Sequence, residues 1–200
     1  EFYKRLGANT AYVGHPLLDI AKANLKREEF YQKFQIPVHK KILTVFPGSR
    51  PQEIKYTFPV LLKAAQRILQ SCPQLQLVVS IINPKFELQI KQQIQKIGLK
   101  DVIFYSDIQH NLIAYTYLSL TPSGTITLEH ALLETPCIVA YKFSRISYML
   151  LNFVASKVRE RIKYISLPNQ IMGARIIPEC IQDDATPETL VKEAFRILDN

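Results

Sequence analysis

The stretch YLSLTPSGTITLEHALLETPCIVAY, residues 117–141, contains an apolar run, a turn, a helix-like segment and a second apolar run. Residues 117–121 and 137–141 are nearly continuous in apolar and β-branched side chains, which is typical of strands covered on both faces. Between them, Pro122 and Gly124 mark a turn, and residues 126–133 then read as a largely apolar helix. This succession predicts two parallel strands joined by a right-handed crossover.

The same alternation of strands and helices extends along the chain on both sides of this unit. Further apolar runs predict strands at residues 41–46, 75–82, 102–105 and 163–166. Apolar residues at helical spacing predict helices at residues 58–70, 86–97 and 187–198. The sequence therefore predicts an α/β fold, in which a Rossmann-like parallel sheet has helices on both faces and spans residues 39–200.

The first 38 residues do not follow this alternation. They contain a short strand-like piece at residues 11–14, a turn at His15-Pro16, and a charged segment at residues 20–36 that reads as a helix. We expect residues 1–38 to form the end of a preceding domain and an interdomain linker. Because the pattern is already under way at Glu1, we expect the chain to be a fragment of a longer protein.

The composition narrows the class of protein. Hydrophobic residues make up 48% of the chain and charged residues 21%, which suits a folded domain and excludes a disordered one. Cys72, Cys137 and Cys180 are widely spaced, which argues against a disulfide framework and against a cysteine zinc site. The net charge of +8 makes an anionic lipid surface, a nucleotide diphosphate and RNA candidate partners, beside the simpler interpretation of a basic soluble protein.

One candidate site follows the first strand of the sheet, in VFPGSRPQEI at residues 45–54. In an open parallel sheet, ligands bind at the carboxyl ends of the strands. Ser49 and Gln52 have the spacing of a capping box, which predicts a bond from the Ser49 side chain to the amide of residue 52. Arg50 would then lie in the first turn of a helix, where a cation is unfavourable. It is either simply solvated or it binds an anion such as a diphosphate.

The second candidate site is the turn Ser123-Gly124-Thr125, which follows another predicted strand. Free amides at a helix start bind anions, and glycine allows a ligand to approach the backbone closely. The alternative is plain N-capping by Ser123 or Thr125. Capping leaves Glu129 unexplained, because a capping box places its acid three residues after the cap. A carboxylate one to two turns beyond a phosphate site is well placed to accept hydrogen bonds from sugar hydroxyls.

Five segments stand out when they are taken together: YVGHPLLD (12–19), FPGSRPQEI (46–54), SGTITLEHALLETPCIVAYK (123–142), YISLPNQIMG (164–173) and IPECIQ (177–182). In this order and at this spacing they resemble one family, the lipid-A-disaccharide synthases. The resemblance implies the B-type glycosyltransferase fold, in which two Rossmann-like halves face each other across a cleft. This chain would supply the end of the first half and most of the second, which binds the nucleotide-sugar donor.

The resemblance also implies an activity. The family transfers a sugar from UDP-2,3-diacylglucosamine to 2,3-diacylglucosamine 1-phosphate, which releases UDP and leaves the lipid A disaccharide 1-phosphate. It implies no organic cofactor and no metal, so that Arg50 and the amides at residues 123–125 would stabilise the UDP leaving group. The general base is expected in the first domain, outside this chain. We therefore expect the chain to bind UDP without turning over substrate alone.

Further site residues are implied by the same resemblance. Asn169 matches the family's polar contact to the sugar donor, and Glu179 and Gln182 would face the donor sugar, unless they form the solvated start of a helix. His15 matches the family at the domain junction, but a histidine beside a proline is more typical of a turn than of a catalytic group. The residues expected at the donor site are Ser49, Arg50, Ser123, Gly124, Thr125, Glu129, Asn169, Glu179 and Gln182.

Residues 141–164 join a short apolar centre to flanking basic residues. The centre is too short to span a bilayer. The composition favours a helix on an anionic membrane surface, or alternatively a helix buried on the sheet with a solvated basic end. With lipid substrates, the expected location is the cytoplasm, peripheral on the cytoplasmic face of the inner membrane, and a homodimer is left open.

Other functions remain as alternatives at this point. The same fold would suit a UDP-N-acetylglucosamine transferase of cell-wall synthesis or a 2-epimerase. A basic nucleic-acid-binding domain would suit the charge, but its motifs and its interleaved aromatic residues are not found. A membrane-associated scaffold would leave the placement of Arg50, Ser123 and Glu129 unexplained.

Overall fold

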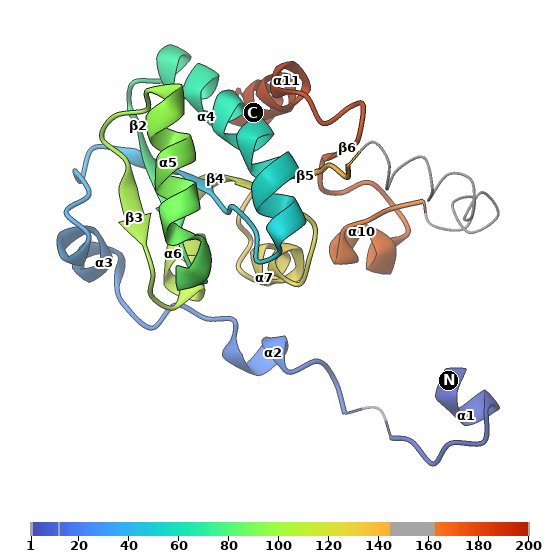
Figure 1. Ribbon diagram of the computed structural model, residues 1–200. Coiled ribbons are helices and arrows are strands. Elements are labelled where there is room, and N and C mark those ends of the chain that lie inside the picture. The colour runs from blue at the N-terminus through green and yellow to red at the C-terminus, as the bar shows by residue number, and fades with distance from the viewer. Residues whose placement is uncertain (1, 12, 145–162, 200) are drawn as a thin grey trace.

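A computed structural model describes residues 2–11, 13–144 and 163–199. Its centre is a six-stranded parallel sheet with the strand order β3-β2-β1-β4-β5-β6 (Figure 1). The strands are β1 (Lys41–Val45), β2 (Leu75–Ser80), β3 (Ile103–Tyr105), β4 (Thr116–Thr121), β5 (Cys137–Tyr141) and β6 (Glu179–Ile181). The predicted α/β fold with a Rossmann-like parallel sheet is therefore confirmed.

The direction in which strands are added reverses between β1 and β4. The chain runs outward from β1 to β2 and β3, then returns to the other side of β1 and continues through β4, β5 and β6. The pairing of Val45 with Leu120 aligns the carboxyl ends of β1 and β4. This is the topological switch point, where the loops after two neighbouring strands diverge and leave a crevice for a ligand.

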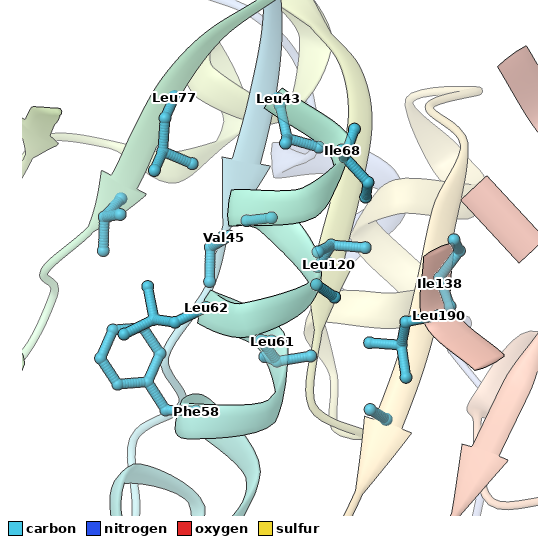
Figure 2. Packing of buried hydrophobic residues seen from close by; sticks show 14 of the residues in the cluster. Leu43, Val45, Phe58, Leu61, Leu62, Ile68, Leu77, Leu120, Ile138 and Leu190 are labelled. Carbon is cyan, nitrogen blue, oxygen red and sulfur yellow. The ribbon is translucent and has the colours of Figure 1, made fainter. Parts of the chain in front are cut away.

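One face of the sheet is covered by α4 (Phe58–Ser71), α5 (Glu87–Ile97) and α11 (Pro187–Leu198). Figure 2 shows α4 laying its apolar side chains against β1, β2 and β4, while Leu190 of α11 lies beside Ile138 of β5. The side chains of Leu61, Leu62 and Ile68 are completely buried, and each such burial contributes about 1.5–3 kcal/mol. A short π-helix, η1 (Glu53–Thr57), joins the loop after β1 to α4.

The other face carries α3 (Arg27–Lys33), α6 (Gln109–Tyr115) and α7 (Ile126–Leu132). Phe30 of α3 is completely buried against Tyr105. The side-chain oxygen of Asn111 accepts hydrogen bonds from the amides of residues 24 and 25, which fixes the chain ahead of α3 to α6. Residues 24–36 thus pack with the sheet, whereas α1 (Phe2–Arg5) and α2 (Leu17–Ile20) lie on a segment that extends away from it (Figure 1). The domain boundary near residue 38 stays a prediction.

Three local predictions were wrong. Residues 163–166 form no strand, and the sixth strand is β6 instead. The amides of residues 165 and 166 bond the Glu179 carboxylate rather than a neighbouring strand, and α10 (Leu167–Met172) follows at once. The described residues of 11–14 are irregular, and the helix predicted at 20–36 is limited to α3.

The single turn of 3-10 helix η2 (Pro84–Phe86) leads into α5.

Among the helices of the described residues, none combines the length and the apolar character needed to cross a bilayer. Most of the basic apolar segment predicted at 141–164 lies outside the described residues.

Candidate functional site

A cavity of about 330 Å³ lies at the switch point. The loop after β1 forms one wall and the loop after β4 forms the other. The carboxyl end of β2 and the first residue of α6 make smaller contributions. Its lining residues include Gly48, Ser49, Arg50, Glu53, Ser80, Ile82, Asn83, Gln109, Ser123, Gly124 and Thr125. The two turns that the sequence singled out therefore meet across one hollow.

The turn after β4 presents backbone amides without side-chain caps. Thr125 occupies the N-cap position of α7 but makes no side-chain cap bond, and the Ser123 hydroxyl donates instead to the Ile165 carbonyl at 2.8 Å. No described residue accepts a hydrogen bond from the amides of residues 124–126. The capping interpretation of this turn is thus wrong, and the residues that carry these free N–H groups line the cavity. An anion bound there would satisfy such groups.

The loop after β1 is held by a buried carboxylate. Glu53, only 4% exposed, accepts hydrogen bonds from the Ser49 amide at 2.8 Å and the Arg50 amide at 3.1 Å. The capping box predicted between Ser49 and Gln52 is therefore wrong: Glu53, one residue further on, supplies the cap. Gly48 allows this close approach, since its φ is +102° and a Cβ there would lie 2.4 Å from the Glu53 carboxylate.

This arrangement divides the electrostatic roles between the two loops. Because Glu53 already occupies the amides of Ser49 and Arg50, those amides are not available to a phosphate. Arg50 is exposed and belongs to the cavity lining, so it brings a positive charge to this loop. The two loops therefore offer different groups to an anion: a guanidinium on one and the free amides of residues 124–126 on the other.

Glu129 lies just behind the cavity rather than in its lining. It is 4% exposed, and both of its carboxylate oxygens accept hydrogen bonds from the Gln109 side-chain amide, at 2.9 and 3.1 Å. Nε2 of His110 is 3.1 Å from the same carboxylate. Burial raises the pKa of Glu129, while His110 and the hydrogen bonds oppose this shift. Gln109 thus stands between Glu129 and the cavity.

The remaining three predicted site residues lie outside the cavity lining. Asn169 is completely buried in α10, and Glu179 belongs to β6, where its carboxylate bonds backbone and side-chain groups of residues 165–169. Gln182 is buried at the end of β6, and its side-chain oxygen accepts from the amide of Phe143 at 3.0 Å. The alternative of a solvated helix start for Glu179 and Gln182 is also wrong.

A sequence model of the family described as lipid-A-disaccharide synthetase matches residues 1–200. The chain belongs to the lipid-A-disaccharide synthetase family. The lipid-A-disaccharide synthase of Geobacter sulfurreducens is 33% identical over 199 residues, a match that covers 100% of this chain and 50% of that protein. The chain thus spans about half the length of the curated relatives it matches.

Solved structures show the same fold at lower identity. ADP-heptose lipopolysaccharide heptosyltransferase II of E. coli superposes with a TM-score of 0.58 and 12% identity, covering 94% of this chain and 53% of that chain. The UDP-GlcNAc 2-epimerase of Methanocaldococcus jannaschii gives a TM-score of 0.55 and 15% identity, covering 92% and 45%. This lipid-A-disaccharide synthetase chain therefore shares its fold with about half of each of these two chains.

Reasoning from the sequence missed three polar residues of the site in this member of the family. Glu53 and Gln109 line the cavity and organise its two ends, and the Ser80 hydroxyl at the end of β2 is buried with no hydrogen-bond partner among the described residues. The signal for Ser80 and Gln109 was their position near the carboxyl ends of the strands predicted at residues 75–82 and 102–105. Glu53 lies within the segment at residues 45–54, but the capping box was predicted to end one residue earlier, at Gln52.

Proposed function

We propose that this chain carries the nucleotide-sugar site of a lipid-A-disaccharide synthase. The whole enzyme would join UDP-2,3-diacylglucosamine to 2,3-diacylglucosamine 1-phosphate, giving the lipid A disaccharide 1-phosphate and UDP. The observation that carries the proposal is the cavity at the switch point, where Arg50 faces a turn of unsatisfied amides at residues 124–126. Membership of the family supports the choice of substrates.

The proposed chemistry depends on charge that develops on the leaving group. As the bond from the sugar to the diphosphate breaks, negative charge grows on UDP. Arg50 and the amides at the start of α7 would stabilise that charge in the transition state without a metal or an organic cofactor. The ribose would lie at the end of the cavity formed by Gln109, with Glu129 behind it.

The second half of the reaction requires a general base near the acceptor hydroxyl. We propose that this base belongs to the half of the enzyme that the chain does not span. Asn169, Glu179 and Gln182 remain in the proposed site as supporting residues, because each is fixed by hydrogen bonds within the protein. The chain by itself would bind UDP and not turn over substrate.

The lipid substrates support a location at a membrane surface. We propose that the enzyme is peripheral on the cytoplasmic face of the inner membrane, with the basic side chains of residues 141–164 against anionic lipid. The net charge of +8 and the basic composition of that segment support this placement.

Calorimetric titration of UDP, UMP and ADP into the chain tests the proposal. We expect UDP to bind more tightly than UMP or ADP, and Arg50→Ala to weaken UDP by about tenfold to a hundredfold, because one charge-assisted contact is lost. Arg67→Ala is the matched control, since Arg67 pairs with Glu188 on the surface away from the cavity. Equal binding of the three nucleotides, or an equal loss in both variants, would contradict the proposal.

A further inference from the structure

Asn169 has no hydrogen-bonding capacity left for a ligand. Its side-chain NH₂ donates to the carbonyl of Ile177 and to the carboxylate of Glu179, both at 2.8 Å. Its side-chain oxygen accepts from the amides of Ile176 and Ile177 at 2.9 and 2.8 Å. An asparagine side chain has two N–H donors and two lone pairs, so the protein satisfies all four.

The Glu179 carboxylate is similarly saturated. One oxygen accepts from the Ile165 amide at 3.0 Å, and the other accepts from the Ser166 amide, the Ser166 hydroxyl and Asn169. A carboxylate with four donors is strongly fixed, and its bonds to N–H and O–H groups are charge-assisted. Glu179 therefore holds the two residues that precede α10 in one conformation.

Ile165, the first of these two residues, in turn bonds a residue of the cavity lining. The carbonyl of Ile165 accepts the hydrogen bond of the Ser123 hydroxyl at 2.8 Å, and Ser123 lines the cavity at the turn after β4. A continuous path of hydrogen bonds thus runs from Asn169 through Glu179 and Ile165 to Ser123. Every link in this path joins groups that are buried or partly buried.

We propose that Asn169 and Glu179 are positioning residues for the Ser123-Gly124-Thr125 turn and do not contact the sugar donor. They hold the Ile165 carbonyl at the point where it orients Ser123, and the turn then keeps its free amides aimed at the diphosphate. The proposal rests on the proposed function, because it assigns the diphosphate to these amides. It explains why two motif residues lie outside the cavity lining.

The path of hydrogen bonds affects ligand binding because it preorganises the turn at residues 123–125. Amides that already point at the ligand need no reorganisation when it arrives, whereas a loosened turn must be ordered at the expense of affinity. In Glu179→Gln, an NH₂ group replaces one acceptor oxygen and faces the N–H groups of Ile165 or Ser166. At least one bond of the network is then lost while the side-chain size is kept.

The binding test uses Glu179→Gln, Ser123→Ala and the double variant, titrated with UDP and with UDP-N-acetylglucosamine. We expect Glu179→Gln to weaken both ligands equally, by about fivefold to twentyfold. The double variant should lose no more affinity than the single variant with the larger loss, because both substitutions break the same path. Glu193→Gln is the matched control, since that partly buried acid pairs with Arg175 and should leave both affinities unchanged.

Two results of these titrations would overturn the inference. A loss confined to UDP-N-acetylglucosamine would mean that Glu179 contacts the sugar directly, and additive losses in the double variant would mean that the two residues act independently. Thermal unfolding of each variant shows whether the titrations were made on folded protein.

Amide hydrogen exchange of the ligand-free chain separates this inference from the proposed function. Glu179→Gln should speed exchange at residues 127–129, whose amides donate to the carbonyls of Gly124 and Thr125, at least several-fold, and Glu193→Gln should not. Unchanged exchange would overturn the inference even if UDP binds. If the wild-type chain fails to bind UDP, the proposed function fails, and exchange still decides whether Glu179 positions the turn.

Discussion

At the residue scale, His130 shows how the fold fixes α7 beside the cavity. Its imidazole is completely buried, with Nδ1 2.8 Å from the Ile126 carbonyl and Nε2 2.8 Å from the Ser119 hydroxyl. A carbonyl can only accept, so Nδ1 carries the proton and Nε2 accepts from Ser119. This neutral tautomer joins α7 to β4, and burial lowers the pKa of His130 to about 4.

The lowered pKa of His130 predicts a loss of stability in acid. The unfolded chain takes up the proton near pH 6.5, whereas the folded chain does so only near pH 4. The stabilising contribution is therefore fully present above pH 6.5 and is lost as the pH falls through this window, by roughly 2–4 kcal/mol. Denaturant unfolding between pH 7 and pH 4 measures the effect. His130→Gln should give a shallower dependence on pH, and an unchanged slope would show that the histidine does not titrate as described.

At the scale of single elements, the loop after β1 depends on Gly48 and Glu53. In Gly48→Ala, the new Cβ would meet the Glu53 carboxylate at 2.4 Å, and the backbone φ of +102° would be strained as well. We expect a destabilisation of about 2–4 kcal/mol and weaker UDP binding, because the amides of Ser49 and Arg50 lose their common acceptor. Unfolding and titration measure the two effects.

Gly98→Ala separates backbone strain from the clash at Gly48. Gly98 ends α5 with a φ of +76°, and a Cβ there meets nothing within 4 Å. Its replacement should cost only about 1 kcal/mol and leave UDP binding unchanged. Equal costs for the two glycines would mean that the contact with Glu53 is unimportant.

The strands differ in how well the sequence predicts them. Strands buried on both faces, such as β1 and β4, carry a continuous apolar signal and were predicted to within one residue of their bounds. The apolar run near residues 163–166 carries a similar signal, but its amides are bonded by a carboxylate that comes later in the chain. β6 is short and contains Glu179, so no apolar pattern marked it.

At the scale of the whole molecule, the site depends on strand order. Arg50 and Ser123 are far apart in sequence and meet because β4 pairs with β1 on the side opposite β2. The sequence predicted both turns, since each follows a recognisable strand. It could not show that the turns share one cavity, nor that Glu129 is covered by Gln109, because both facts arise from tertiary packing.

A ¹⁵N amide spectrum of the chain, recorded as UDP is added, tests whether UDP binds at the switch point between β1 and β4. We predict that the largest shifts occur at Gly124, Thr125, Ile126 and the Arg50 side chain, with smaller shifts at the Gln109 side-chain amide. Saturable shifts gathered at another surface, or no shifts at millimolar UDP, would contradict the claim that this cavity is the nucleotide site.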